Sequence, residues 1–156
     1  VRKGNKVILI RHSLAPGGGD PTGFMIGDCK TQRNLNKAGI EQSKKIGKIF
    51  KDNKISIDIV LSSEWCRCKD TAYYAFGKFK EFSALNSTFS TPYNENEPKQ
   101  VKEIEEYLMN WKSEGKNLIL ITHYSIITTI TNAAPSSGEI VIADKNLNVI
   151  GTIKTN

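Results

Sequence analysis

The chain has 156 residues, of which 38% are hydrophobic and 24% are charged. This length and composition are typical of one globular domain over residues 1–156 and exclude a disordered chain. No apolar run approaches the roughly 18 residues that a transmembrane helix needs, so no membrane span is expected. The formal net charge is +6. Because no run of five or six basic residues occurs, we expect no nucleic-acid binding, and the excess charge indicates either a solvated surface or attraction of an anionic substrate.

Short apolar runs alternate along the chain with segments of helical spacing. In chain order, the predicted elements are a strand over residues 7–10, a loop over 16–21, a helix capped by Asn36, a strand over 58–61, a helix over 66–76, a short strand over 82–85, a helix from 97 that Gly115 can end, a strand over 117–122, a helix over 125–131, and a hairpin of 139–143 and 148–153. Strands that alternate with helices predict an α/β fold of three layers, with a mainly parallel central sheet and helices on both faces.

Polar residues follow directly after the three most apolar strands. They are Arg11-His12, Ser62-Ser63 and Thr122-His123. Ligands bind outside the carboxyl ends of the strands in such sheets, so we expect these residues to converge. Arg67 follows the middle strand within one turn of a predicted helix start.

Two histidines and two arginines at the strand ends are suited to phosphoryl transfer. A neutral imidazole keeps a lone pair and can attack phosphorus, while arginine offers a planar fork of donors to phosphate oxygens. The alternative is that His12 and His123 only cap or pack the strand ends and that Arg67 lies on the surface. We interpret Gly17-Gly18-Gly19 as a flexible turn, because it lacks the Lys-Ser/Thr ending of a nucleotide-binding loop.

The three cysteines are Cys29, Cys66 and Cys68. Cys66-x-Cys68 is too tight for the usual zinc knuckle, so we expect no metal site. Cys29 and Cys66 each follow a buried strand and should lie on the same side of the sheet, which predicts a disulfide between them and a free, packed Cys68. The alternatives are three reduced thiols in a cytoplasmic protein, or a reactive Cys66 whose thiol is activated by Arg67.

Three motifs resemble those of the histidine phosphatase superfamily, which includes the phosphoglycerate mutases. Val7–Ser13 is similar to its Arg-His-Gly strand, with Ser13 in place of the glycine. Leu61–Ala72 matches its Ser-Ser-x-x-x-Arg-x-x-x-Thr-Ala pattern, and Ile119–His123 resembles its third motif. The order and spacing fit over nearly the whole chain, so the resemblance implies a phosphoglycerate-mutase-like fold.

The resemblance implies a role for each matched residue. His12 would attack phosphorus and form a phosphohistidine, while Arg11, Arg67 and His123 would hold the phosphoryl oxygens. Water would then release phosphate without a metal or other cofactor.

Further segments are similar to those of a bacterial group of short histidine phosphatases. They are Gly19-Asp20-Pro21, Asp28-Cys29, Thr31-Gln32-Arg33-Asn34-Leu35, Trp65-Cys66-Arg67 and Leu85-Asn86-Ser87. From this set we include Arg33 as a candidate substrate-binding residue. Many members of the group carry a signal peptide, and this chain starts at Val1, so we expect a periplasmic or secreted protein, with a cytoplasmic location as the alternative.

The acid that protonates the leaving group is at neither customary position. Ser87 stands where mutase-like members have a glutamate, and Tyr124 where the acid-phosphatase branch has an aspartate. The remaining candidates are Asp20, Asp28, Glu95 and Glu97. We favour Asp20, because it follows His12 in a loop that should overhang the strand ends.

These features together predict a metal-independent phosphomonoesterase that acts on a small phosphorylated substrate. A mutase fits less well, because the chain is short and lacks the glutamate. Two alternatives stay open. One is a phosphate-binding or regulatory module with little turnover; the other is a phosphatase of protein phosphohistidine, whose phosphoramidate bond breaks with only a weak acid. The sequence leaves the oligomeric state open.

Overall fold

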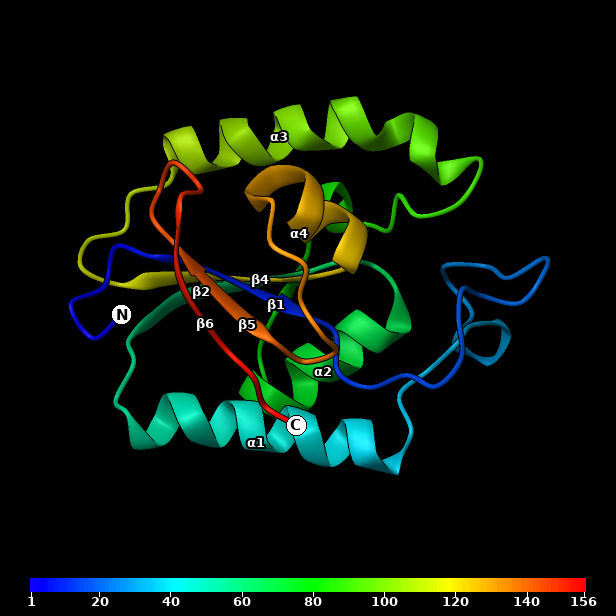
Figure 1. Ribbon diagram of the computed structural model, residues 1–156, viewed down its shortest axis with the longest axis horizontal. Helices are drawn as coiled ribbons and strands as arrows, with labels where there is room; N and C mark the ends of the chain where they lie inside the picture. The colour runs from blue at the N-terminus through cyan, green and yellow to red at the C-terminus, as the bar shows by residue number, and fades with distance from the viewer.

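The computed structural model describes residues 1–156 and contains one six-stranded sheet in the order β3-β2-β4-β1-β5-β6 (Figure 1). The strands are β1 (Val7–Arg11), β2 (Ile57–Ser62), β3 (Lys80–Glu81), β4 (Asn117–Thr122), β5 (Ile140–Ala143) and β6 (Val149–Ile153). The α-helices are α1 (Lys37–Asp52), α2 (Cys66–Phe76), α3 (Glu97–Asn110) and α4 (Tyr124–Thr131). Strands β1 to β4 pair in parallel with one another, whereas β5 is antiparallel to β1 and forms an antiparallel hairpin with β6.

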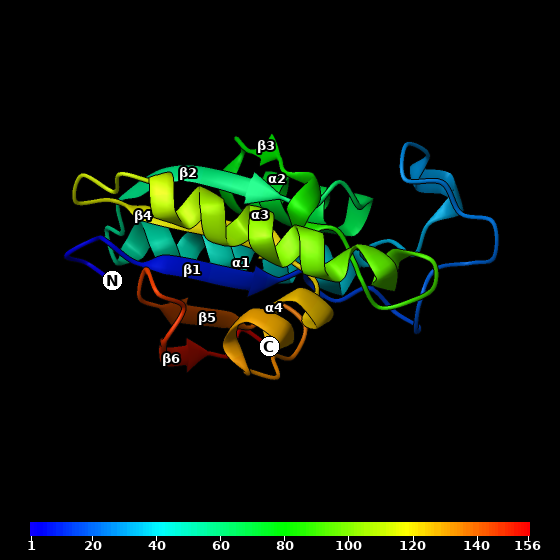
Figure 2. The ribbon, with the colours of Figure 1, turned by 90° about the horizontal axis from the view of Figure 1, so that it is seen from above.

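The helices cover both faces of the sheet. Figures 1 and 2 show α3 and α4 on one face and α1 and α2 on the other. Alternate residues of the central strands enter two separate cores: Leu9 packs with the residues of α3 and α4, and Ile10 with those of α1 and α2. Each fully buried aliphatic side chain contributes about 1.5–3 kcal/mol to stability. The predicted three-layer α/β fold is therefore confirmed.

Most local predictions also hold. Asn36 caps α1, its side-chain oxygen accepting the Gly39 N–H at 2.8 Å, and α2 begins and ends at the predicted residues. The terminal hairpin is present as β5 and β6. None of the helices has the length and hydrophobicity of a membrane-spanning segment.

The predicted strand over 82–85 is wrong, and its failure has a local cause. The strand in this region is β3, two residues earlier, and Ser83–Leu85 forms a 3₁₀ helix. The buried Gln100 amide donates to the carbonyls of Ala84 and Asn86, at 2.9 Å each. These backbone groups thus obtain partners outside a sheet, which removes the need for strand pairing.

Helix α3 ends at Asn110, before the predicted stop at Gly115. Trp111 leaves the helix in an extended conformation and is buried, with its indole N–H donating to Asp58 at 2.9 Å. Burial of this ring decides the helix end, and Gly115, with φ of +81°, serves the turn into β4 instead.

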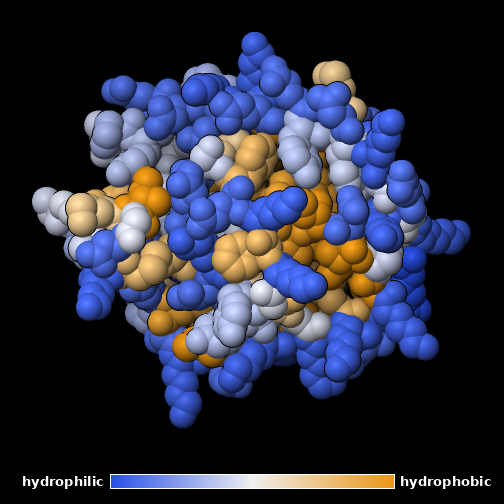
Figure 3. Space-filling model, turned by 180° about the vertical axis from the view of Figure 1, so that it is seen from behind, coloured by the Kyte–Doolittle hydropathy of each residue, from blue (hydrophilic) through white to orange (hydrophobic).

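The sheet has an incomplete edge at β2. Strand β3 pairs only with Leu61 and Ser62, so the earlier residues of β2 have no strand partner on that side. Figure 3 shows this rear face of the molecule, with apolar side chains gathered at its centre among hydrophilic ones. The exposed Asp58 carboxylate lies on this edge and discourages pairing with another strand.

Candidate active site

The three polar strand ends meet as predicted. In the parallel register, Arg11 lies beside Thr122, and Ser62 lies beside Ile121. A cavity of about 350 Å³ opens at this end of the sheet. Its walls contain every residue predicted for the site, namely Arg11, His12, Asp20, Arg33, Arg67 and His123. The structure therefore brings all six side chains together, while their individual roles stay predictions.

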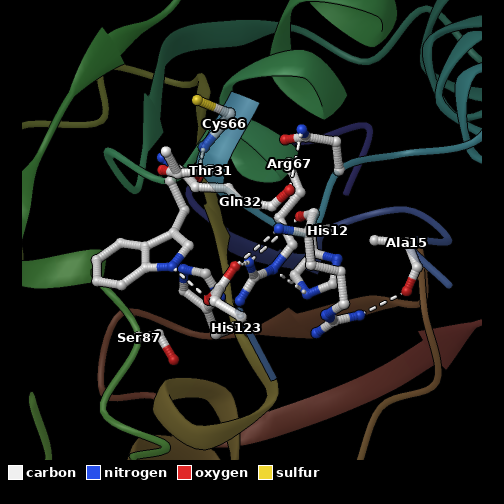
Figure 4. A network of polar contacts seen from close by, with 12 residues as sticks. His12, Ala15, Thr31, Gln32, Cys66, Arg67, Ser87 and His123 are labelled. Atoms are coloured by element: carbon white, nitrogen blue, oxygen red, sulfur yellow. Dashed lines mark hydrogen bonds and ion pairs between the residues drawn. The ribbon is translucent and has the colours of Figure 1, made fainter. Parts of the chain in front are cut away.

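His12 is buried and held as a neutral imidazole. Its Nδ1 lies 2.9 Å from the Ser13 carbonyl oxygen, so Nδ1 carries the hydrogen and donates it. The lone pair is then on Nε2, which accepts a hydrogen bond from Arg67 Nε at 3.2 Å (Figure 4). Burial, followed by the Arg67 charge, lowers the pKa of His12 well below its usual 6.5. The ring is thus prepared as a nucleophile at neutral pH.

Ser13, the departure from the family motif, points away from the cavity. It is fully buried, and its hydroxyl oxygen accepts a hydrogen bond from Ser43 of α1 at 2.8 Å. Its backbone N–H donates to Thr71 of α2 at 3.0 Å. The Ser13 hydroxyl therefore ties the segment after β1 to α1, and its backbone N–H ties the same segment to α2.

His123 faces His12, with ring centroids 5.5 Å apart. Its Nε2 lies 2.8 Å from the Ser63 hydroxyl, and its buried Nδ1 has no hydrogen-bond partner. Burial and then the Arg67 charge lower the pKa of His123 well below 6.5. If the Ser63 hydroxyl donates to Nε2, the ring hydrogen lies on Nδ1, where it is available to a ligand.

Asp20 holds Arg67 in place rather than standing free. One carboxylate oxygen accepts from Arg67 Nη1 at 2.8 Å and from the Arg33 backbone N–H at 3.0 Å, and the other accepts from the Trp65 indole at 3.0 Å. Burial alone would raise the pKa of Asp20, but these donors and the Arg67 charge together lower it below its usual range. An ionised, fully bonded carboxylate has no proton to give, so the geometry disfavours Asp20 as the acid.

The other candidate acids lie outside the cavity lining. Asp28 caps a 3₁₀ helix by accepting the Lys30 N–H, and Glu97 accepts hydrogen bonds from the Thr88 and Thr129 hydroxyls. At the two customary acid positions, Ser87 and Tyr124 do line the cavity. Asp20 is thus the one carboxylate in the wall.

Arginine side chains give the cavity a positive charge. Arg11 Nη1 donates to the Pro135 carbonyl at 2.9 Å, and Arg33 Nη1 donates to the Ala15 carbonyl. The Nε atoms of both arginines are buried without a partner. Three guanidinium groups face one carboxylate and two neutral imidazoles, so the cavity attracts an anion that supplies hydrogen-bond acceptors.

The predicted disulfide is present. Cys29 and Cys66 are bonded with their Cα atoms 5.7 Å apart, and Cys68 is free and buried. The structure thus differs from the two alternatives, three reduced thiols and a reactive Cys66. Burial raises the pKa of the Cys68 thiol to about 12, so this group is not a nucleophile at neutral pH.

Several residues of the cavity wall were not predicted from the sequence, among them Trp65 and Phe89. Trp65 was not among the residues predicted for the site, but its indole N–H donates to Asp20 and its ring meets that of His123 edge-on, with the centroids 5.5 Å apart. Trp65 lies two residues before Arg67 in the Ser-Ser-x-x-x-Arg motif, and this position could have indicated that it belongs to the site. Phe89 also lines the cavity, and no pattern in the sequence indicated it.

The two neutral histidines predict the pH dependence of the protein. Below pH 6.5, histidines take up protons in the unfolded chain but not in the folded one, so the free energy of unfolding should fall as pH decreases through this window. NMR titration should place both imidazole pKa values below 6.5, and inorganic phosphate should raise them, since an anion favours imidazolium. Values at or above 6.5 in the phosphate-free protein would contradict this account of the site.

Comparison with known proteins establishes the fold. No protein-family profile matches the chain, and no curated protein sequence is significantly similar to it. Among solved structures, SixA from Agrobacterium tumefaciens superposes with a TM-score of 0.65 at 17% identity, covering 96% of this chain and 98% of that one. The protein histidine phosphatase SixA complexed with tungstate gives 0.63 at 15%, covering 96% and 97%. Phosphoglycerate mutase from Thermus thermophilus gives 0.63 at 14%, covering 97% and 99%. The chain therefore shares the fold of these solved proteins, and the predicted phosphoglycerate-mutase-like fold is confirmed.

Proposed function

We propose that this protein hydrolyses phosphomonoesters through a phosphohistidine formed on His12. One observation carries the proposal: the unprotonated Nε2 of His12 is buried at the base of a cavity that three arginines and a second histidine surround. SixA, which shares the fold, has been solved in complex with tungstate, a phosphate analogue, and this supports oxyanion binding by a protein of this fold.

The geometry supports a two-step reaction. The guanidinium groups of Arg11 and Arg67 bind the non-bridging oxygens, and His12 Nε2 attacks phosphorus while the bond to the leaving-group oxygen breaks. The Nδ1–H bond to the Ser13 carbonyl stabilises the positive imidazole of the phosphohistidine. A water molecule then attacks phosphorus, the P–N bond breaks, and phosphate leaves with His12 neutral again. When the Ser63 hydroxyl donates to His123 Nε2, the Nδ1–H of His123 donates to the phosphoryl oxygens in both steps.

A second candidate substrate is protein phosphohistidine. The observation that favours it is the ion-paired state of Asp20, because the cavity then has no carboxylic acid for a strongly basic leaving group. An imidazole leaving group can take its proton from solvent on its remote nitrogen, so it needs little help from the protein.

The Cys29–Cys66 disulfide favours an oxidising compartment for this activity. We therefore propose a periplasmic or secreted location.

The test of the proposed function is hydrolysis of an aryl phosphate in excess chelator. A good leaving group does not need a strong acid, so the enzyme should release phosphate at a rate that chelation leaves unchanged. The chain also offers no group of three or more potential metal-ligating side chains. Binding of phosphate without turnover would identify a binding module instead. Activity lost in chelator and restored by a divalent ion would contradict the mechanism.

A further inference from the structure

Aromatic rings from three separate segments line the cavity. They are Phe24 from the loop after β1, Phe89 from the loop before α3, and Tyr124 at the start of α4. Phe89 is 74% exposed and Tyr124 is 42% exposed. Both rings line the cavity and are largely open to solvent, so they offer apolar surface to a ligand bound there.

An aromatic wall formed by Phe24 and Trp65, with Tyr93 packed against both rings, extends from the loop after β1 to the reacting end of the cavity. The ring centroid of Phe24 lies 5.6 Å from those of Trp65 and Tyr93. Trp65 in turn lies 5.5 Å from the ring of His123. These rings hold one another in tilted and edge-on contacts, so the wall is organised before any ligand binds.

Other residues of the lining are small or polar. Gly17, Gly18 and Gly19 leave space beside the arginines, and no atom lies within 4 Å of a Cβ built on Gly18 or Gly19. The remaining groups near Phe89 are the hydroxyls of Ser87, Ser90 and Ser125. The cavity thus combines an anion-binding floor, one aromatic wall and a few hydroxyl groups that can form hydrogen bonds.

The same lining contains no free carboxylic acid, because Asp20 is bound by Arg67 and Trp65. A leaving group must therefore depart with little protonation, which favours phenols and imidazoles over alkyl alcohols. This chemical restriction and the aromatic wall are independent observations, and both favour a flat ring.

We propose that the mouth of the cavity is a leaving-group subsite for a planar ring that carries the phosphoryl group directly. The substrates would be aryl phosphates or N-phosphorylated imidazoles, with the ring against Phe89 and Phe24. This inference rests on the proposed phosphatase function and adds the class of leaving group to it.

The test compares two substrates of equal leaving-group acidity in the wild-type protein and its Phe89 variants. One is phenyl phosphate, and the other is a fluorinated alkyl phosphate whose alcohol is as acidic as phenol. The wild type should prefer the phenyl ester in kcat/KM. Phe89→Ala should lower kcat/KM for phenyl phosphate by about fivefold to tenfold and change the alkyl ester less than about twofold, whereas Phe89→Tyr should retain the preference. Met109→Ala, which removes an equally exposed side chain (76%) from α3, is the matched control.

The possible results separate failure of the subsite from failure of the phosphatase function. Equal efficiency on both esters, or an equal loss in Phe89→Ala, would overturn the subsite while leaving the phosphatase intact. Turnover of neither ester would reject the phosphatase and this inference together. Peptides that carry phosphotyrosine or phosphohistidine then separate the two ring chemistries, and preferential hydrolysis of either one over a phosphoserine peptide supports the subsite.

Discussion

Replacing His12 with alanine is expected to reduce phosphatase activity by at least about 10³-fold, which corresponds to about 4 kcal/mol of lost transition-state stabilisation. The variant keeps the arginines that bind the phosphoryl group but has no atom to attack phosphorus. The side-chain hydrogen bonds of His12 go to the adjacent Ser13 and to Arg67, so the substitution breaks no hydrogen bond between strands, and we expect the variant to fold. Steady-state hydrolysis of an aryl phosphate measures the loss, and circular dichroism confirms the fold.

A trapping experiment separates a nucleophile from a residue that only positions the substrate. Wild-type protein quenched during turnover of a ³²P-labelled substrate should carry label that is stable in base and labile in acid, as expected for phosphohistidine. His12→Ala should carry none. His123→Asn, the matched control at the facing ring, should still be labelled, though more slowly. Label retained in a folded His12→Ala protein, or activity close to wild type, would show that another group attacks phosphorus.

The positions of the functional side chains could be predicted because they depend on simple rules. The run Val7–Ile10 is apolar at every position, which requires burial on both faces and hence a central strand of a parallel sheet. Neighbouring parallel strands have their carboxyl ends at the same edge of the sheet. His12 and His123 therefore had to converge, although 110 intervening residues separate them in the chain. Arg67 joined them because it lies in the first turn of the helix that follows β2.

What could not be predicted depends on contacts between side chains far apart in the sequence. The position of Asp20 near His12 was predictable, but its ionised state depends on an indole 45 residues away and on the Arg33 backbone. The 3₁₀ helix at Ser83–Leu85 depends on the amide of Gln100 in the same way. Local pattern gives the location of such groups, whereas their protonation and backbone pairing are decided by the assembled fold.

The loop that carries Asp20 and Arg33 has little regular structure, and its attachment to the site is concentrated at a few points. One is the Cys29–Cys66 disulfide, which adjoins Arg67 in the chain. Another is Gln32, whose side-chain oxygen accepts the Cys66 N–H at 3.0 Å (Figure 4). The Gln32 side-chain amide also donates to the carbonyls of Met25 and Ile26. The bridge therefore fixes the segment that supplies the ionic partner of Arg67.

Removing this bridge is expected to lower the free energy of unfolding by roughly 3–4 kcal/mol, because Cys29 and Cys66 lie 37 residues apart and the bond restricts the unfolded chain. Denaturant titration of Cys29→Ser, Cys66→Ser and the double variant measures the effect. Each single substitution breaks the same bond, so the three variants should be destabilised almost equally rather than additively. Reductant should destabilise the wild type to a similar extent and leave the double variant unchanged. Aryl phosphatase activity should also decrease when the bridge is removed, because Asp20 then loses its fixed position beside Arg67. Thiol titration of the denatured, unreduced wild type should find one free thiol, that of Cys68. Three free thiols, or additive losses in the double variant, would mean that the two cysteines stabilise the protein by packing alone.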